Sequence, residues 1–277
     1  MNNDNIQRKP ELSIIIVNFN SGELLGNCIV SILRDIDVDF EVVVYDNASS
    51  DMSVTGLSHN PRINIIYSEE NIGFARANNL AAKAASGRLL HFLNPDIEVN
   101  ATLNDAYKQL ITANGNDIWV TGLTNELGEV QKNKHIVPRI GNMFRHLTGN
   151  SDVALWNLGA SIIIGYEAFW RIGGWPEDYF MYAEDLDFFY TAYRFRIPVH
   201  YLETNLKHIG KGTTKKIWSD EQRAMIVESS YRKFFRKYNA NWEYLLIRPL
   251  QLFYILLTEP ASFVLYGKVF LKTLFIK

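Results

Sequence analysis

Three carboxylates lie within four positions of one another at Glu184, Asp185 and Asp187, directly after the aromatic-rich residues 179–182. Like charges this close repel one another and reduce stability unless helix N–H groups, a metal ion or a proton relieve them. A carboxylate partly enclosed by aromatic rings has a raised pKa and can take a proton from an attacking hydroxyl. The cluster is therefore a candidate general base, although acidic residues also favour the first turn of any helix.

Asp96 is a second candidate, because it follows Asn94-Pro95 at the end of an apolar run. A hard carboxylate in this place can hold Mg2+ or Mn2+, and the cation can neutralise a bound diphosphate. The alternative is that Asp96 caps a helix.

His208 begins a passage that is rich in glycine and lysine and includes Lys211. An isolated histidine is usually structural, but this composition is typical of a loop that closes over a diphosphate.

Polar residues also follow the first two apolar runs of the chain. Asn18 and Asn20 come after residues 12–17, and Asp46 comes after residues 40–45. Open parallel sheets bind ligands at the carboxyl ends of their strands, so these positions are candidates for ligand contact. Asn18 and Asp46 together offer the donors and acceptors that a pyrimidine base requires. Turn formation alone also explains Asp46, because such residues bond their own backbone.

An alternation of strands and helices must position these side chains. The β-branched run at residues 12–17 predicts a strand buried on both faces, and hence a parallel sheet. Further strands are predicted at residues 40–45, 63–67, 89–93 and 118–121, with helices at residues 21–33 and 75–86. This alternation is typical of βαβ units. No Gly-x-Gly-x-x-Gly follows the first strand and residues 210–214 lack P-loop spacing, which disfavours dinucleotide oxidoreductases and P-loop ATPases.

The second half of the chain follows a stretch, residues 125–156, for which we predict no secondary structure. Beyond it the pattern predicts a strand at 159–165, an extended segment at 199–202, and helices at 167–172, 185–195 and 219–238. We divide the chain into a catalytic domain, residues 1–240, and an apolar helical tail, residues 241–277. Within the catalytic domain we expect a donor half at about 12–122 and an acceptor half at about 157–216.

Composition excludes several classes of protein. The chain has 277 residues, 47% hydrophobic and 21% charged, which is typical of soluble globular proteins. With 28 Lys+Arg against 30 Asp+Glu the net charge is -2, so a globally basic nucleic-acid binder is excluded. Cys28 has no second cysteine to pair with, and we expect it to be buried on a helix. Residues 1–11 lack the apolar stretch of a signal peptide, so we expect a cytoplasmic protein.

The tail is dense in Leu, Phe, Ile and Tyr. The charged residues that interrupt it are Arg248, Glu259, Lys268 and Lys272. Its longest uncharged run, residues 249–258, is half of the roughly 20 residues that a spanning helix needs. Two interpretations remain: amphipathic helices that lie in the interface of an anionic membrane, or a helical cap packed on the catalytic core or on a second copy. The interleaved Lys and Arg favour the membrane, because they can reach lipid phosphates.

Taken in order, the motifs along residues 12–216 make a longer pattern. They are Ser13-Ile-Ile-Ile-Val-Asn18, Asp46-Asn-Ala-Ser49, Asn71-Ile-Gly-Phe-Ala-Arg-Ala-Asn-Asn79, Leu93-Asn-Pro-Asp96, Gly159-Ala-Ser161, Gly173-Gly-Trp175, Phe180-Met-Tyr-Ala-Glu-Asp-Leu-Asp187 and His208. This succession resembles the family 2 glycosyltransferases of the GT-A fold, particularly bacterial rhamnosyltransferases. The resemblance implies an α/β fold with a Rossmann-like mixed, mainly parallel sheet flanked by helices; the helical tail lies outside it.

The resemblance also implies roles for individual residues. The nucleobase side would be held by Asn18, Asn20 and Asp46, and the donor pocket would be shaped by Asn71, Gly73, Phe74, Arg76 and Asn79. Asp96 and His208 would bind Mg2+ or Mn2+, and Asp185 would be the base, positioned with help from Glu184. Many GT-A enzymes carry Asp-x-Asp where this chain has Asn94-Pro-Asp96, a form that the rhamnosyltransferase-like branch shares.

The implied activity is a metal-assisted, inverting transfer of a sugar from a dTDP- or UDP-linked donor, with dTDP-rhamnose as the leading candidate. The acceptor would be a glycolipid or polysaccharide in cell-surface glycan synthesis, such as O-antigen, at the inner face of the cell membrane. Two alternatives stay open. One is a nucleotidyltransferase, which the missing glycine-rich phosphate loop disfavours. The other is an inactive membrane partner subunit that retains the fold, which Asn94 would favour.

Overall fold

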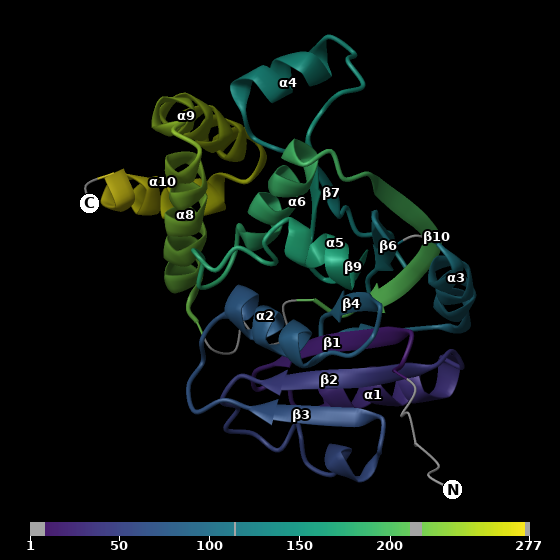
Figure 1. Ribbon diagram of the computed structural model, residues 1–277. Coiled ribbons are helices and arrows are strands. Elements are labelled where there is room, and N and C mark those ends of the chain that lie inside the picture. The colour runs from purple at the N-terminus through teal and green to yellow at the C-terminus, as the bar shows by residue number, and fades with distance from the viewer. Residues whose placement is uncertain (1–8, 114, 211–217, 275–277) are drawn as a thin grey trace, which may run out of the picture.

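An eight-stranded sheet forms the centre of the computed structural model, which describes residues 9–113, 115–210 and 218–274 (Figure 1). The strand order is β3-β2-β1-β4-β9-β6-β10-β5. The four neighbouring parallel strands are β1 (Leu12–Asn18), β2 (Phe40–Asp46), β3 (Ile63–Tyr67) and β4 (Leu89–Leu93). The other half contains β9 (Ser161–Gly165), β6 (Ile118–Thr124), β10 (Val199–His208) and β5 (Ile97–Glu98).

Helices cover both faces of this sheet. One face packs on α1 (Glu23–Asp35) and α3 (Ala101–Thr112), and the other on α2 (Phe74–Ala84), α5 (Tyr166–Arg171) and α6 (Glu184–Arg194). Successive side chains of a strand point to opposite faces, so Ile14 and Ile16 enter the first core and Ile15 enters the second. All three are fully buried. The prediction of a strand buried on both faces is therefore confirmed, and buried Cys28 lies on α1 as expected.

The sheet is mixed, whereas residues 12–17 taken alone predict a parallel one. β9 runs antiparallel to both of its neighbours, β4 and β6, and β5 runs antiparallel to β10. All five side chains of β9 are buried. A continuous apolar run of this kind shows that a strand is covered on both faces, but it does not show which way the strand runs.

Residues 125–156, for which no elements are predicted, contain β7 (Lys134–Ile136), α4 (Ile140–Leu147) and β8 (Leu155–Asn157). β7 and β8 form a two-stranded sheet of only three residue pairs. The segment is closed by a buried amide, because Asn142 donates to the carbonyls of Val137 and Ala154. Elements this short show too few residues for a period to be visible in the sequence.

The chain ends in α8 (Asp220–Lys237), α9 (Asn241–Thr258) and α10 (Pro260–Leu274). A third core joins them to the catalytic part, because Phe234, Phe235, Tyr244 and Ile247 pack with Leu186 of α6. Figure 1 shows α8, α9 and α10 gathered at one side of the sheet. Within the described residues, none of the helices has both the length and the apolar character that crossing a bilayer requires. A short 3-10 helix, Leu57–His59, precedes β3.

Candidate active site

The carboxyl ends of β1 and β2 bring Asn18 and Asp46 side by side, as the register of the two strands requires. The Asn18 amide donates to Asp46 Oδ1 at 2.8 Å and to Ser53 Oγ at 2.8 Å, and its carbonyl accepts from the Ser21 hydroxyl. Asn18 is fully buried and Asp46 is 4% exposed. Protein partners therefore occupy the Asn18 side chain, which fixes the loop after β2, and its role toward a nucleobase stays a prediction.

Asn20 connects the loops that follow β1 and β2. Its side-chain oxygen accepts from the Ser50 amide at 2.7 Å, and its own backbone N–H donates to Ser49 Oγ at 3.0 Å. Asn20 has a left-handed backbone with φ of 50°, a conformation that asparagine tolerates better than most residues. The predicted nucleobase residues thus form one hydrogen-bonded edge of the sheet.

Asn71 and Gly73 form the next part of this edge, together with Asn47, whose role the sequence does not predict. Asn47 donates to Asn71 Oδ1 at 2.9 Å and accepts from the Ile72 amide at 2.9 Å. Gly73 has φ of +86°, and a Cβ there would lie 2.4 Å from the carbonyl oxygen of Phe180. Only glycine fits both conditions. Asn47 belongs to the Asp-Asn-Ala-Ser motif, but turn formation alone explains that motif. The sequence therefore gives no separate indication of the contacts that Asn47 makes.

Helix α2 carries three further predicted donor-pocket residues, and they differ in environment. The Phe74 ring meets Trp175 edge to face at 5.5 Å. Asn79 donates to the Trp175 carbonyl at 2.8 Å and accepts from the Trp175 amide at 2.9 Å, so it holds the Gly173-Gly-Trp175 turn. Arg76 is exposed, and no ion pair joins it to another described residue. Of the three, Arg76 is thus the side chain available to an anionic ligand.

Asp96 and His208 come together although they lie far apart in the sequence. The antiparallel pairing of β5 with β10 places His208 opposite Ile97, and His208 Nε2 lies 3.5 Å from Asp96 Oδ1. Both side chains are largely buried, at 12% and 14% exposure. Adjacent ligand atoms of an octahedral Mg2+ lie about 3 Å apart, so this pair fits one divalent cation. Described residues include no group of three metal-ligating side chains, so water and diphosphate oxygens would complete the shell.

Gln131 orients His208, a role that the sequence does not predict. Gln131 Oε1 lies 2.8 Å from His208 Nδ1, and Gln131 Nε2 donates to the His208 carbonyl at 2.9 Å. The hydrogen bond at Nδ1 fixes the ring so that Nε2 faces Asp96. Histidines that bind metals are usually held by such a hydrogen bond on the other ring nitrogen. Gln131 lies in the stretch without periodicity, where nothing in the sequence distinguishes it. Lys211, predicted near the diphosphate, lies outside the described residues.

Glu184 and Asp185 begin α6, as predicted. Asp185 accepts hydrogen bonds from the Leu186 amide at 2.8 Å and the Gly159 amide at 3.3 Å. Burial raises the pKa of both carboxyls, and the Asp185 charge raises the pKa of Glu184 further. Glu184 Oε2 is buried without a hydrogen-bond partner among the described residues. The pair therefore shares a proton more readily than two exposed carboxylates would.

Asp187, the third carboxylate of the cluster, serves the structure instead. It is fully buried and accepts from Lys237 Nζ at 2.6 Å and from the Tyr238 hydroxyl. This ion pair joins α6 to the end of α8.

His91 is also structural, as expected. It is buried between Tyr107 and Ser161, and burial lowers its pKa to about 3.

A chain of backbone contacts joins the Asp96–His208 pair to Asp185. β4 and β9 pair antiparallel, with Leu93 opposite Ser161. The Asn94 amide donates to the Ala160 carbonyl at 2.9 Å, and the amide of the preceding residue, Gly159, donates to Asp185. Asn94-Pro-Asp96 therefore lies beside the residues that contact Asp185.

This mixed, mainly parallel sheet with helices on both faces is a GT-A fold. The chain belongs to glycosyl transferase family 2, because the profile of that family matches residues 13–164, more than half of the chain. A curated relative, the low-salt glycan biosynthesis hexosyltransferase Agl10 of Haloferax volcanii, is 29% identical over 68% of this chain. The matched part of the chain spans 64% of the length of that protein. It spans 28% and 36% of the lengths of two other curated relatives.

Solved structures agree on the fold. The mannosyltransferase PcManGT of Pyrobaculum calidifontis, in complex with GDP-Man and Mn2+, has a TM-score of 0.57 at 19% identity and covers 95% of this chain and 74% of that one. TarS residues 1–349 of S. aureus, in complex with UDP-GlcNAc, has a TM-score of 0.56 at 16% identity and covers 82% and 73%. The resemblance to rhamnosyltransferases in particular is not reproduced among these relatives.

Proposed function

We propose that this protein transfers a hexose from a nucleotide-sugar to a hydroxyl group of a cell-surface glycan precursor, with inversion at the anomeric carbon. The observation that carries the proposal is the β4–β9 pairing, which joins the Asp96–His208 pair to Asp185 through Asn94 and Gly159. One site thus offers a place for a diphosphate and a base for a hydroxyl. Family membership and the name of the Haloferax relative support the same reaction class.

In this reaction Asp185 takes the proton of the acceptor hydroxyl as its oxygen attacks the anomeric carbon. The bond from that carbon to the diphosphate oxygen breaks, and its electron pair leaves with the nucleoside diphosphate. Asp96 and His208 would hold Mg2+ or Mn2+, which neutralises the charge on the leaving diphosphate when bound. Burial raises the pKa of Asp185, and the neighbouring Glu184, whose own pKa is raised by burial and by the Asp185 charge, would help to position this base.

The donor would bind at the edge formed by Asn20, Asp46 and Asn71, with Arg76 available to its phosphates. TarS in its UDP-GlcNAc complex and PcManGT in its GDP-Man complex support a nucleotide-sugar donor and leave the base and sugar open. We keep dTDP-rhamnose as the first donor to test, with UDP-linked sugars beside it.

A donor panel tests the proposal. Purified protein with Mn2+ and a membrane lipid extract should release nucleoside diphosphate from one donor far faster than from the others, and a radiolabelled sugar should enter the lipid fraction. Asp185→Asn protein is the matched control and should release almost none. Release of pyrophosphate would instead support the nucleotidyltransferase alternative. If no donor in the panel is consumed, the inactive-subunit alternative replaces the proposal.

The tail supports a peripheral position on the inner face of the cell membrane. All residues of α9 are described, and its two charged ones are turned inward: Glu243 pairs with Arg139 at 2.9 Å, and Arg248 pairs with Glu228 at 2.8 Å. Its exposed side chains include Trp242, Leu246, Leu250, Phe253, Tyr254 and Leu257. A helix with charges inside and apolar groups outside favours an apolar environment over water.

The basic residues of the tail contribute less than its composition suggests. Arg248 is paired with Glu228, and Lys268 and Lys272 both lie beside Glu221, at 3.5 and 2.6 Å. Their charge is therefore largely balanced within the protein. Binding to an anionic membrane would rest mainly on insertion of the apolar face of α9, and association of two copies through the same face is the alternative.

A further inference from the structure

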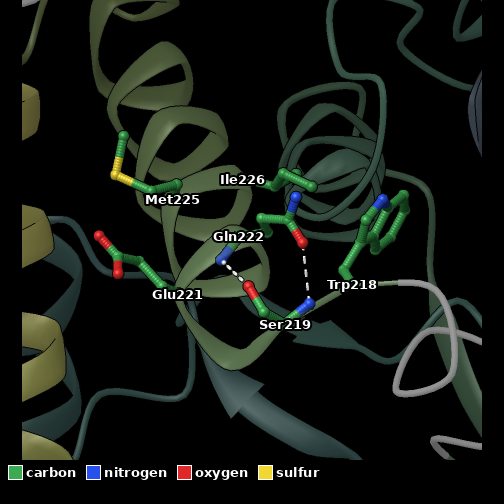
Figure 2. Close-up of a pocket in the computed structure, with 6 residues that line it drawn as sticks. All are labelled: Trp218, Ser219, Glu221, Gln222, Met225 and Ile226. Atoms are coloured by element: carbon green, nitrogen blue, oxygen red, sulfur yellow. Dashed lines mark hydrogen bonds between the residues drawn. The ribbon is translucent and has the colours of Figure 1, made fainter.

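A cavity of about 590 Å³ lies at the beginning of α8. Its lining residues are Trp218, Ser219, Glu221, Gln222, Met225 and Ile226 (Figure 2). The Trp218 indole stands at one side and the Met225 side chain at the other, with Gln222 and Ile226 between them. The lining thus combines an aromatic ring and two apolar side chains with three polar ones.

Phe180 connects this cavity to the active site. Its backbone carbonyl accepts from the Phe74 amide at 3.2 Å and lies against Gly73, both on the donor side. Its ring is 42% exposed and meets the Trp218 ring at 6.2 Å. One residue therefore contacts the donor edge through its backbone and the tryptophan of the cavity through its ring.

Residues 181–183 link Glu184 and Asp185 to α8, the helix that lines the cavity. The Met181 carbonyl accepts from Ser230 Oγ of α8 at 2.8 Å. Tyr182 and Ala183 follow with left-handed backbones, at φ of 65° and 64°, an arrangement that costs energy for residues other than glycine. Glu184 and Asp185 come next. The strained turn therefore sets the direction in which Glu184 and Asp185 leave residues 181–183, and this segment is anchored to α8, the helix that lines the cavity.

The chemistry of the lining suits a neutral molecule with hydroxyl groups. The Glu221 carboxylate already pairs with Lys272 at 2.6 Å and with Lys268 at 3.5 Å, so it adds no net negative charge to the lining. Gln222 accepts from the Ser219 amide through Oε1, and its Nε2 group donates to no described residue. A pyranose ring has an apolar C–H face, which packs on an aromatic ring, and a rim of hydroxyls, which bond to amides and carboxylates.

Resting on the proposed function, we propose that this cavity binds a pyranose ring of the acceptor saccharide, with Trp218 as its stacking platform. The proposed donor edge meets the Phe180 backbone and the cavity meets its ring, so an acceptor sugar in the cavity would approach Asp185 from the α8 side. Trp218 and Phe180 are then residues that determine acceptor specificity, and neither takes part in proton transfer.

Saturation-transfer NMR tests the proposal without requiring catalysis. The probes are the methyl glycosides of glucose, galactose, mannose and rhamnose, which have no alkyl chain to bind the apolar face of α9. We expect ring-proton saturation of at least one glycoside by the wild-type protein, a loss of about tenfold in affinity for Trp218→Ala, and near-wild-type binding for Trp218→Phe. Trp242→Ala removes an exposed tryptophan of α9 and serves as the matched control.

Met225→Lys is a second variant, to be used if Trp218→Ala proves unstable. It places a charge in the cavity and should abolish glycoside binding. Nucleoside diphosphate affinity should stay unchanged in every variant, because the donor edge is untouched. Failure of the wild-type protein to bind any of the four glycosides, or equal binding by Trp218→Ala, would overturn the assignment. Trp218-dependent binding in a protein that consumes no donor would retain the sugar site and refute the proposed reaction instead.

Discussion

At the scale of single residues, Asp185 has the properties that a general base requires. Burial raises the pKa of its carboxyl, while the amides of Gly159 and Leu186 favour its charged form. The carboxylate therefore has a stronger affinity for a proton than an exposed Asp and still ionises when the site is formed. Its orientation depends on two backbone groups from different elements, so small shifts of β9 against α6 would change its basicity.

Asp185→Asn should lower the rate of transfer at least about a hundredfold and leave donor affinity within a fewfold, because an amide keeps the shape but cannot accept the proton.

In the wild-type enzyme the base must be ionised, so activity should fall as the pH drops through the raised pKa of the Glu184–Asp185 pair. The acidic limb of the kcat/KM profile should lie above the ordinary Asp pKa of about 4. A profile that is flat down to that pH would assign the base to another group.

The Asp96–His208 pair leads to a second prediction at this scale. Asp96→Ala should weaken nucleoside diphosphate binding about tenfold or more when Mn2+ is present and have little effect in chelator, as titration calorimetry would measure. Glu98→Ala is the matched control, because Glu98 lies two residues away and pairs with Lys207 at 3.0 Å. Equal binding with and without Mn2+ in the wild-type protein would remove the metal from the mechanism.

At the scale of elements, α6 performs two tasks with one acidic sequence. Its first two residues, Glu184 and Asp185, are the proposed catalytic pair, and Asp187 anchors the helix to Lys237 and Tyr238 at the end of α8. The motif alone does not distinguish these uses, because all three carboxylates lie in the first turn. The distinction comes from α8, which lies some fifty residues further along the chain.

Asp187→Ala should reduce the free energy of unfolding by about 3 kcal/mol, because it leaves a Lys237 charge partly buried without its inner partner. Asp178→Ala removes the other carboxylate beside the same Lys237, at 59% exposure, and should change stability by less than about 1 kcal/mol. Urea denaturation of the two variants measures the contrast. Similar losses for both would mean that the buried pair does not hold α6 to α8.

At the scale of the whole molecule, α4 and α9 lie at the same end, and the Arg139–Glu243 pair joins them (Figure 1). α4 adds exposed Phe144 and Leu147 to the apolar side chains of α9. Together these residues offer a broad surface on which the molecule would rest against lipid, with insertion driven by apolar burial.

Leu250→Glu combined with Phe253→Glu should weaken sedimentation with phosphatidylcholine–phosphatidylglycerol vesicles about a hundredfold, from the loss of two inserted side chains. Val30→Glu, which changes a comparably exposed apolar residue on α1, should bind as the wild type does. Raising the salt concentration should weaken binding only modestly, because Arg248, Lys268 and Lys272 have protein partners. A wild-type protein that ignores vesicles and forms a defined dimer would identify the face as a subunit contact.

Much of this architecture follows from local pattern. The strands at residues 63–67 and 89–93 were predictable, because each is a short apolar run of the length that is typical of a strand. The helix predicted at residues 185–195 begins one residue earlier, at Glu184, and its first turn is acidic, as is common in helices. The proximity of Asp96 to His208 came from family resemblance, since no local pattern brings residues so distant together. Gln131 and Asn47 were not predictable, because each acts through a contact that exists only after distant loops have packed.

The position of β9 between β4 and β6 has a consequence for how the chain is made. β4 ends at Leu93 and β6 at Thr124, but the strand that fills the gap between them does not begin until Ser161. While the ribosome synthesises the intervening residues, both strands have an edge with unpaired N–H and C=O groups, which readily recruit other chains. A nascent chain therefore has unpaired strand edges over this interval, and an N-terminal fragment that stops short of β9 cannot complete its sheet.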